Sequence, residues 1–218
     1  MWEQQSELSC LLNTKDMNYK LVFIDDHMRE GVNDPFVRPI KKLKKDAEIS
    51  VFTDPAEGLR YVMDNLDSRM LVFIDRKFDE YPLQGLNILK EIRNKTSLLY
   101  IVMMSVSPLR EMPEEELQEM INEDYISFFN RNNGTITDAC NIIEKVENIW
   151  RSRFDCVLER WLIRHSEDAD KVAYTTAGHT YTWKEILTEL RLQTPAGKTM
   201  EQMVNEFFLY QVAEEKGV

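Results

Sequence analysis

The chain has few cysteines and no long hydrophobic run. Only three cysteines occur among 218 residues, at positions 10, 140 and 156, and none form a C-x-x-C pair. This pattern argues against a disulfide framework or a cysteine-bound metal, and it fits a reducing compartment. No apolar run approaches the roughly 18 residues that a membrane helix needs. The first residues, MWEQQSELSC, lack a basic stretch followed by an apolar one, so we expect no signal peptide and a cytoplasmic location.

The sequence also lacks a surplus of positive charge. It carries 27 Lys and Arg against 38 Asp and Glu, for a net charge of −11. A dedicated nucleic-acid-binding protein usually has a basic surplus, so nucleic acid is not the expected partner. Hydrophobic residues make up 43% of the chain, which is enough for a packed core.

Short apolar runs alternate with amphipathic segments through the first two-thirds of the chain. The runs are YKLVFI (19–24), EISVF (48–52), RMLVFI (69–74), LLYIVMM (98–104) and YISFF (125–129), with helices expected over 33–45, 54–66, 83–94 and 111–123. Runs this short and this apolar are typical of strands buried on both faces of a parallel sheet. The alternation predicts a doubly wound α/β fold with a five-stranded parallel sheet. Ligands bind beyond the carboxyl ends of the strands in such sheets.

The last third of the chain has a different pattern. Residues 134–165 place apolar side chains at helical spacing and predict one long helix, or two joined end to end. A hairpin is expected over 170–183, followed by a helix that Thr182 caps with Glu185 as its capping-box partner. A final helix after residue 194 has an apolar face that needs a partner. We therefore divide the chain into an N-terminal extension (1–17), an α/β domain (18–150) and a C-terminal module of hairpin and helices (151–218).

Acidic residues close two of the predicted strands. The pentapeptide LVFID occurs twice and ends once at Asp25 and once at Asp75. Asp26 extends the first of these, and Ser105 closes the fourth strand. A single aspartate at the end of a strand is commonly the N-cap of the next helix. Three acids and a hydroxyl at one edge of a sheet instead favour a ligand site.

Together with the segment FIDRKFDEYPLQGLNILKEIR (73–93), these residues resemble the bacterial response-regulator receiver (CheY-like) domain over about residues 18–150. The resemblance implies that Asp75 accepts a phosphoryl group. It also implies that Asp25, Asp26 and Asp75 hold Mg²⁺ with the main-chain carbonyl of Lys77, and that Ser105 binds a phosphoryl oxygen. Mg²⁺ prefers hard oxygen ligands and neutralises charge on phosphoryl oxygens, so the chemistry fits these residue types.

The sequence departs from the receiver pattern at two places. The lysine expected after the fifth strand is absent, and Arg131 takes its place in the best alignment, with Asn130 as the other candidate. Arginine can hold a phosphate, but its planar fork does not reproduce lysine geometry. The second departure is Gly85, which falls about two residues late after the acceptor. Phe128 matches the position of the aromatic switch residue in the family. An aromatic side chain that packs in the core is an equally good interpretation of this residue.

These observations lead us to expect a two-component signalling protein. A histidine kinase or another phosphodonor would phosphorylate Asp75, and the change would switch the binding of an unidentified output protein. No enzyme activity is expected beyond self-catalysed phosphoryl transfer and dephosphorylation. The alternatives are a phosphorylation-independent pseudo-receiver adaptor and a DNA-binding regulator that uses residues 170–218. A homodimer is compatible with each of these hypotheses. We expect His27, which follows the acid pair, to be an exposed loop residue.

Overall fold

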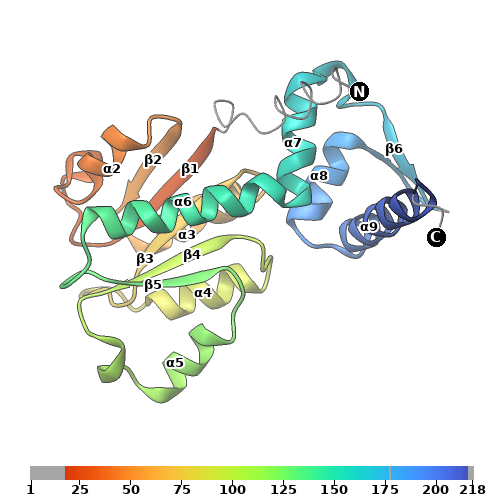
Figure 1. The fold of residues 1–218 in the computed structure, drawn as a ribbon. Coiled ribbons are helices and arrows are strands. Elements are labelled where there is room, and N and C mark those ends of the chain that lie inside the picture. Colours follow the sequence, from red (N-terminus) through yellow and green to blue (C-terminus); the bar gives the residue numbers. More distant parts are fainter. Residues whose placement is uncertain (1–17, 177, 216–218) are drawn as a thin grey trace. The chain divides into compact units, whose positions relative to one another are not determined.

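The computed structural model describes residues 18–176 and 178–215, so the predicted N-terminal extension and Cys10 lie outside the described residues. The chain forms two compact units, with the division between Arg151 and Ser152 (Figure 1). The first unit holds the parallel sheet, and the second holds a hairpin and three α-helices.

The sheet of the first unit has five parallel strands in the order β2-β1-β3-β4-β5. The strands are β1 (Tyr19–Ile24), β2 (Ala47–Phe52), β3 (Met70–Asp75), β4 (Tyr100–Ser105) and β5 (Ile126–Asn130). Every residue of β3 and β4 is buried, as the unbroken apolar runs predicted. This strand order is that of a doubly wound sheet with its switch point between β1 and β3. The predicted fold class is therefore confirmed.

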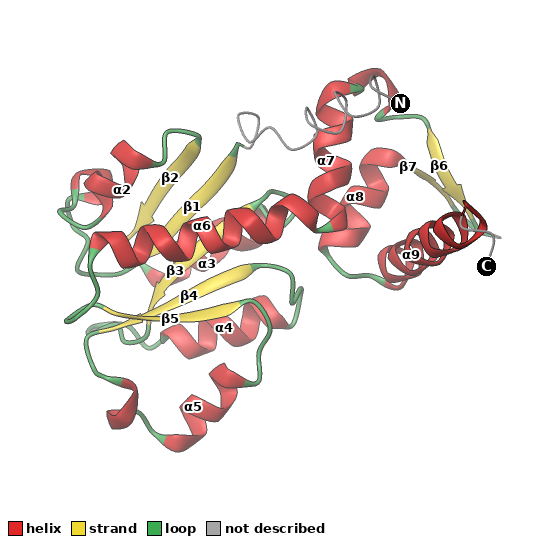
Figure 2. Ribbon diagram, viewed as in Figure 1, coloured by secondary structure: helices red, strands yellow, loops and turns green. Residues whose placement is uncertain are grey.

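Helices cover both faces of this sheet (Figure 2). They are α2 (Val37–Leu43), α3 (Pro55–Asp64), α4 (Gly85–Arg93), α5 (Glu114–Ile121) and α6 (Ile136–Ser152). One apolar core joins α3, α4 and α5 to alternate residues of β1, β3 and β4. On the other face, Tyr19 of β1 lies against Trp150 of α6 at a ring-centroid distance of 5.2 Å, and Phe23 meets Phe36 beside α2.

Local signals in the sequence explain where several helices begin. Asp54 caps α3 by accepting hydrogen bonds from the Ala56 and Glu57 amides, and Pro55 occupies the first helical position. The predicted helix over 33–45 is shorter in the structure. It begins only at Val37, because a short 3₁₀ turn (Gly31–Asn33) comes first and Asp34 then adopts extended backbone angles.

The second unit contains α7 (Phe154–Arg164), a 3₁₀ turn (Ser166–Asp168), β6 (Val172–Thr175), β7 (Thr180–Thr182), α8 (Trp183–Arg191) and α9 (Pro195–Glu215). The long helical segment is thus two helices, because Arg153 has extended backbone angles and separates α6 from α7. The antiparallel hairpin and the capping box of Thr182 with Glu185 are confirmed.

The apolar side chains of α9 divide between the core of the second unit and solvent. Met200 is buried and Val204 packs beside it, in a cluster with side chains of α7 and α8. Further along the helix, Phe207, Phe208, Leu209 and Tyr210 are each at least 59% exposed. Among the described residues, no helix combines the length and apolar character needed to cross a bilayer.

Candidate functional site

The carboxyl ends of four neighbouring strands bring the predicted site residues together. Asp75 is the last residue of β3, and Ser105 is the last residue of β4. Asp25 directly follows β1, and Arg131 directly follows β5. Because parallel strands end at the same edge of a sheet, residues far apart in the sequence meet there.

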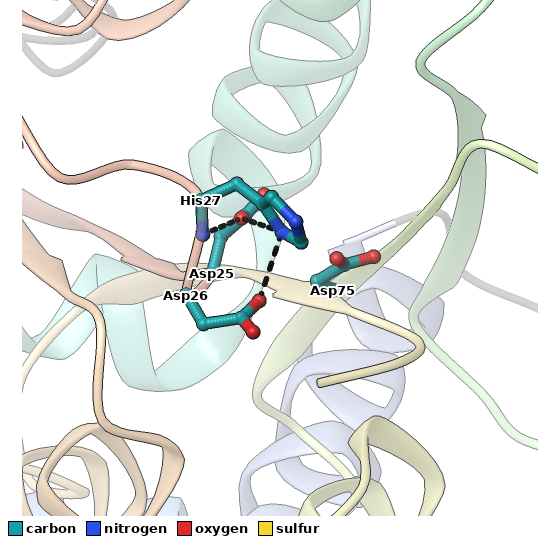
Figure 3. Close-up of side chains that lie close together, drawn as sticks. All are labelled: Asp25, Asp26, His27 and Asp75. Atoms are coloured by element: carbon teal, nitrogen blue, oxygen red, sulfur yellow. Dashed lines mark hydrogen bonds and ion pairs between the residues drawn. The ribbon is translucent and has the colours of Figure 1, made fainter. Parts of the chain in front are cut away.

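Three carboxylates and an imidazole form one cluster at this edge (Figure 3). Asp25, Asp26, His27 and Asp75 each present one ligand atom, and these atoms all lie within 4.8 Å of one another. Asp25 is fully buried and Asp75 is 7% exposed. The three acids that the sequence pattern selected therefore share a single site.

His27 lies beside the acids, and sequence reasoning did not predict its contacts with them. Its side chain is 55% exposed, as expected, but Nδ1 lies 3.0 Å from Asp26 Oδ1 and Nε2 lies 3.3 Å from Asp79 Oδ2. Its main-chain amide also donates to Asp25 Oδ1 at 2.9 Å. Its place directly after the acid pair was the only sequence signal. The contact with Asp79 joins two segments that are distant along the chain, so local pattern could not reveal it.

Burial makes ionisation of these carboxyl groups unfavourable. The pKa of Asp75 rises to about 7, first because the group is buried and then because the Asp25 carboxylate lies close, while the Arg131 guanidinium opposes the rise. Burial also raises the pKa of Asp25, although Arg131 and the His27 amide counteract it. Packed acids that resist full ionisation are typical of a site that takes a cation.

Arg131, rather than Asn130, reaches into the cluster. The Arg131 guanidinium forms an ion pair with Asp25 Oδ2. The side-chain oxygen of Asn130 instead accepts hydrogen bonds from the main-chain amides of Asn132 and Asn133, in the turn after β5. Of the two candidates for the missing lysine, the structure thus places only Arg131 beside the acids.

The donor set fits Mg²⁺ better than a transition metal. Three carboxylates supply hard oxygens, and a lone histidine is a poor magnesium ligand. Asp26 Oδ1 is buried and accepts no hydrogen bond from the described residues, although the His27 ring lies within ion-pair distance. Because Asp26 contributes a carboxylate oxygen to the cluster, the three acids can supply hard ligand atoms for such a cation. Lys77 lies two residues beyond Asp75 with an exposed side chain, and the role of its carbonyl stays a prediction.

Gly85 fixes the backbone beneath Asp75. A Cβ atom at this position would lie 2.2 Å from the Asp75 carbonyl oxygen, so only glycine allows α4 to start so close to β3. The longer loop before it is held by Gln84, whose amide nitrogen donates to the carbonyls of Phe78 and Tyr81. The late position of Gly85 therefore corresponds to an ordered loop that folds back on itself.

Ser105 is held by a residue that the sequence reasoning did not select. Ser105 is 2% exposed, and its hydroxyl accepts hydrogen bonds from Arg76 Nε at 3.3 Å and from the Ser107 amide at 3.1 Å. The register pairs Asp75 with Met104, so the next positions, Arg76 and Ser105, come level on the two strands. Counting along that register would have found Arg76. Phe128, the other predicted switch residue, is half-buried against the core, and its role stays a prediction.

An open cavity of about 500 Å³ lies over Asp75. Its walls include His27, Asp75, Ser105 and Arg131. An anionic group that enters it meets the carboxylate of Asp75, the hydroxyl of Ser105 and the guanidinium of Arg131 within one space. This combination suits the transfer of a phosphoryl group onto a carboxylate.

No family model matches the chain, and no curated protein does. Solved structures that it is similar to include a response regulator receiver domain from Clostridium thermocellum (22% identity, TM-score 0.44), covering 60% of this chain and 94% of that one. The match to a CheY-like receiver domain protein from Methanospirillum hungatei (13% identity, TM-score 0.46) covers 61% of this chain and 95% of that one. The match to the receiver domain of NtrX from Brucella abortus (19% identity, TM-score 0.47) covers 59% of this chain and 98% of that one. At these identities the likeness concerns the fold, and the chemistry of the site rests on the side chains of this chain. The structures to which the chain is similar are thus receiver domains, as the sequence resemblance implied.

Proposed function

We propose that this protein is a two-component signalling protein whose first unit accepts a phosphoryl group on Asp75. The observation that carries the proposal is the convergence of Asp25, Asp26 and Asp75 at the edge of the sheet where Ser105 and Arg131 also lie. An oxygen of Asp75 would form a bond to phosphorus, while the bond from phosphorus to the donor breaks and its electron pair leaves with the donor group. The product is an acyl phosphate.

The neighbouring residues have distinct roles in this proposal. Asp25 and Asp26 would hold Mg²⁺ together with Asp75, and the ion would neutralise the negative charge of the phosphoryl oxygens. The Ser105 hydroxyl donates a hydrogen bond to a phosphoryl oxygen. Arg131 exchanges its partner Asp25 for another phosphoryl oxygen, since a guanidinium is well suited to phosphate. A histidine kinase or a small acyl phosphate is the donor class, and the output partner is a protein.

The first test is phosphorylation by a small donor. The full chain is incubated with acetyl phosphate and Mg²⁺, and its intact mass is measured. We expect the mass of one phosphoryl group on the wild type and none on Asp75→Asn. Glu80→Gln is a matched control, because it removes a nearby acid whose side chain is exposed and that belongs neither to the acid cluster nor to the cavity lining. Its mass gain should equal that of the wild type, and chelation of Mg²⁺ should abolish the gain in both.

A phosphorylation-independent adaptor is the second candidate function. One observation favours it: Arg131 already neutralises Asp25, which is a carboxylate that Mg²⁺ needs. In that case the site would be a closed ion pair that holds a fixed partner-binding surface. An unchanged mass of the wild type, or an equal gain on Asp75→Asn, would exclude phosphorylation of Asp75 and support the adaptor.

A further inference from the structure

Arg76 connects the phosphoryl-binding edge of the sheet to helix α5. Its side chain is only 5% exposed. Nε donates to Ser105 Oγ at 3.3 Å, and Nη1 forms an ion pair with Glu116 Oε2 on α5 at 2.9 Å. A single buried guanidinium therefore contacts both the hydroxyl beside the acceptor and a helix that holds none of the site residues.

The Ser105 hydroxyl has its acceptor capacity filled. A hydroxyl oxygen has two lone pairs and one proton. In Ser105, Arg76 Nε and the Ser107 amide occupy the two acceptor positions, which leaves the proton free to donate. If the hydroxyl turns to donate to an oxygen bound at Asp75, its lone pairs turn away from Arg76.

Helix α5 is poorly anchored by apolar contacts. Met120 is its one buried residue, Leu117 packs against the core only partly buried, and Ile121 is 68% exposed. An element with so little buried surface depends on its few polar links and belongs to the low-stability end of the fold. The pair of Arg76 and Glu116 is such a link, with the guanidinium buried and the carboxylate 31% exposed, while the link from Lys90 of α4 to Glu119 is exposed at both ends. Exposed pairs contribute little to stability.

We propose that Arg76 is a positioning residue that couples Ser105 to α5. While Asp75 is unmodified, Arg76 holds Ser105 and Glu116 together and keeps α5 docked. When a phosphoryl group on Asp75 attracts the Ser105 hydroxyl, Arg76 loses one of its two partners, the pair with Glu116 weakens, and α5 loosens. The event that loosens α5 rests on the proposed phosphorylation of Asp75. The coupling of Ser105 to α5 through Arg76 is a property of the unmodified chain.

The coupling is tested first without any phosphodonor. Hydrogen exchange of the α5 amides is measured by mass spectrometry on the full chain, for the wild type, Ser105→Ala, Arg76→Met and the double variant. We expect Ser105→Ala alone to speed α5 exchange about fivefold or more. In the Arg76→Met background the same substitution should add nothing, since the link is already broken. An equal effect of Ser105→Ala in both backgrounds would overturn the coupling.

The trigger is tested with acetyl phosphate and Mg²⁺. In the wild type, α5 exchange should rise in parallel with the mass gain. The Glu116→Gln variant should gain the same mass as the wild type. Its α5 amides should exchange fast before phosphorylation, and their exchange rate should change little afterwards. Lys90→Met is the matched control, because it removes the exposed link to the same helix and leaves Arg76 in place, so its response should equal that of the wild type.

Failure of this proposal can be told from failure of the proposed function. A full response in Glu116→Gln, with the mass gain intact, would overturn the route through Arg76 and leave phosphorylation standing. Absence of a mass gain on the wild type would overturn the proposed function and the trigger with it. The exchange cycle with Ser105→Ala would then still decide whether Arg76 couples Ser105 to α5.

Discussion

Asp75 lies in an unfavourable environment for its negative charge. Its carboxyl group is 7% exposed and lies beside Asp25, so burial and the neighbouring carboxylate both disfavour the ionised form. Such a group destabilises the fold until a metal ion or a neutral substitution removes the repulsion. The burial of the Asp75 charge thus opposes the stability of the fold.

We predict that Asp75→Asn stabilises the protein in the absence of Mg²⁺. The pKa of Asp75 is about 7 in the fold and near 3.9 when unfolded, so the folded state binds the proton more tightly. Stability of the wild type therefore falls as pH rises from about 4 to 7, and the asparagine variant loses this dependence. The gain above pH 7 is at most about 4 kcal/mol.

Thermal melts of both proteins at pH 5 and pH 8, with a chelator present, measure this effect. The difference in melting temperature should be larger at pH 8. Asp79→Asn, at a carboxylate that is 74% exposed, should show a small difference at both pH values. A variant that melts below the wild type at pH 8 would show that the carboxylate contributes net stability.

Arg131 competes with a metal ion for Asp25. Its guanidinium pairs with the fully buried carboxylate, and a divalent cation must displace that pair or share the oxygen. We predict that Arg131→Met binds Mg²⁺ about tenfold more tightly, on the order of 1.4 kcal/mol, as measured by titration calorimetry. Arg29→Met removes the same charge from an exposed side chain and should leave the affinity nearly unchanged. Weaker binding by Arg131→Met would mean that the guanidinium assists the metal site.

At the scale of elements, a buried polar cluster joins α7 to α8 in the second unit. Asp155 is 2% exposed and accepts hydrogen bonds from Arg153 Nε at 2.6 Å and from Arg191 Nε at 3.3 Å. Arg191 also pairs with Glu159 at 2.9 Å. Burial alone would raise the pKa of Asp155, but the bonds from Arg153 and the charge of Arg191 outweigh it and lower the pKa.

We predict that Asp155→Asn destabilises the second unit by about 3 kcal/mol, since it leaves two arginines without their shared carboxylate. The lowered pKa means that this stabilisation is present above the unfolded pKa of Asp155 and is lost as pH falls through the folded one. The difference between variant and wild type should therefore shrink in strong acid. Hydrogen exchange of the α7 and α8 amides measures the loss of stability in the second unit. Asp170→Asn, which changes an exposed side chain, is the control. Equal protection in wild type and Asp155→Asn at neutral pH would contradict the prediction.

Local sequence patterns predicted the elements well, because short apolar runs and helix caps act over a few residues. The strands, the cap at Asp54 and the capping box at Thr182 all depend on such neighbours. The acid cluster was predictable because the ends of parallel strands converge. Arg76 and His27 were missed, since their partners Glu116 and Asp79 lie about 40 and 50 residues away in the sequence. The break at Arg153 was left open because no proline or glycine marks it.

At the scale of the whole molecule, the sheet unit contains all the site residues. The apolar contacts of the sheet with its helices also lie before the division at Arg151 and Ser152, including the burial of Trp150 in α6. We predict that a chain ending at Ser152 folds by itself, with a cooperative melt and an unchanged mass gain from acetyl phosphate. Aggregation of this fragment would show that the two units depend on each other for folding.

The four aromatic and aliphatic side chains from Phe207 to Tyr210 set a geometric condition on whatever covers them. Consecutive residues on an α-helix point about 100° apart, so these four surround the α9 axis. A flat surface can shield about half of such a ring and leaves the rest in water. Complete shielding takes a concave surface, such as a groove or several packed helices, that encloses the rod on most sides.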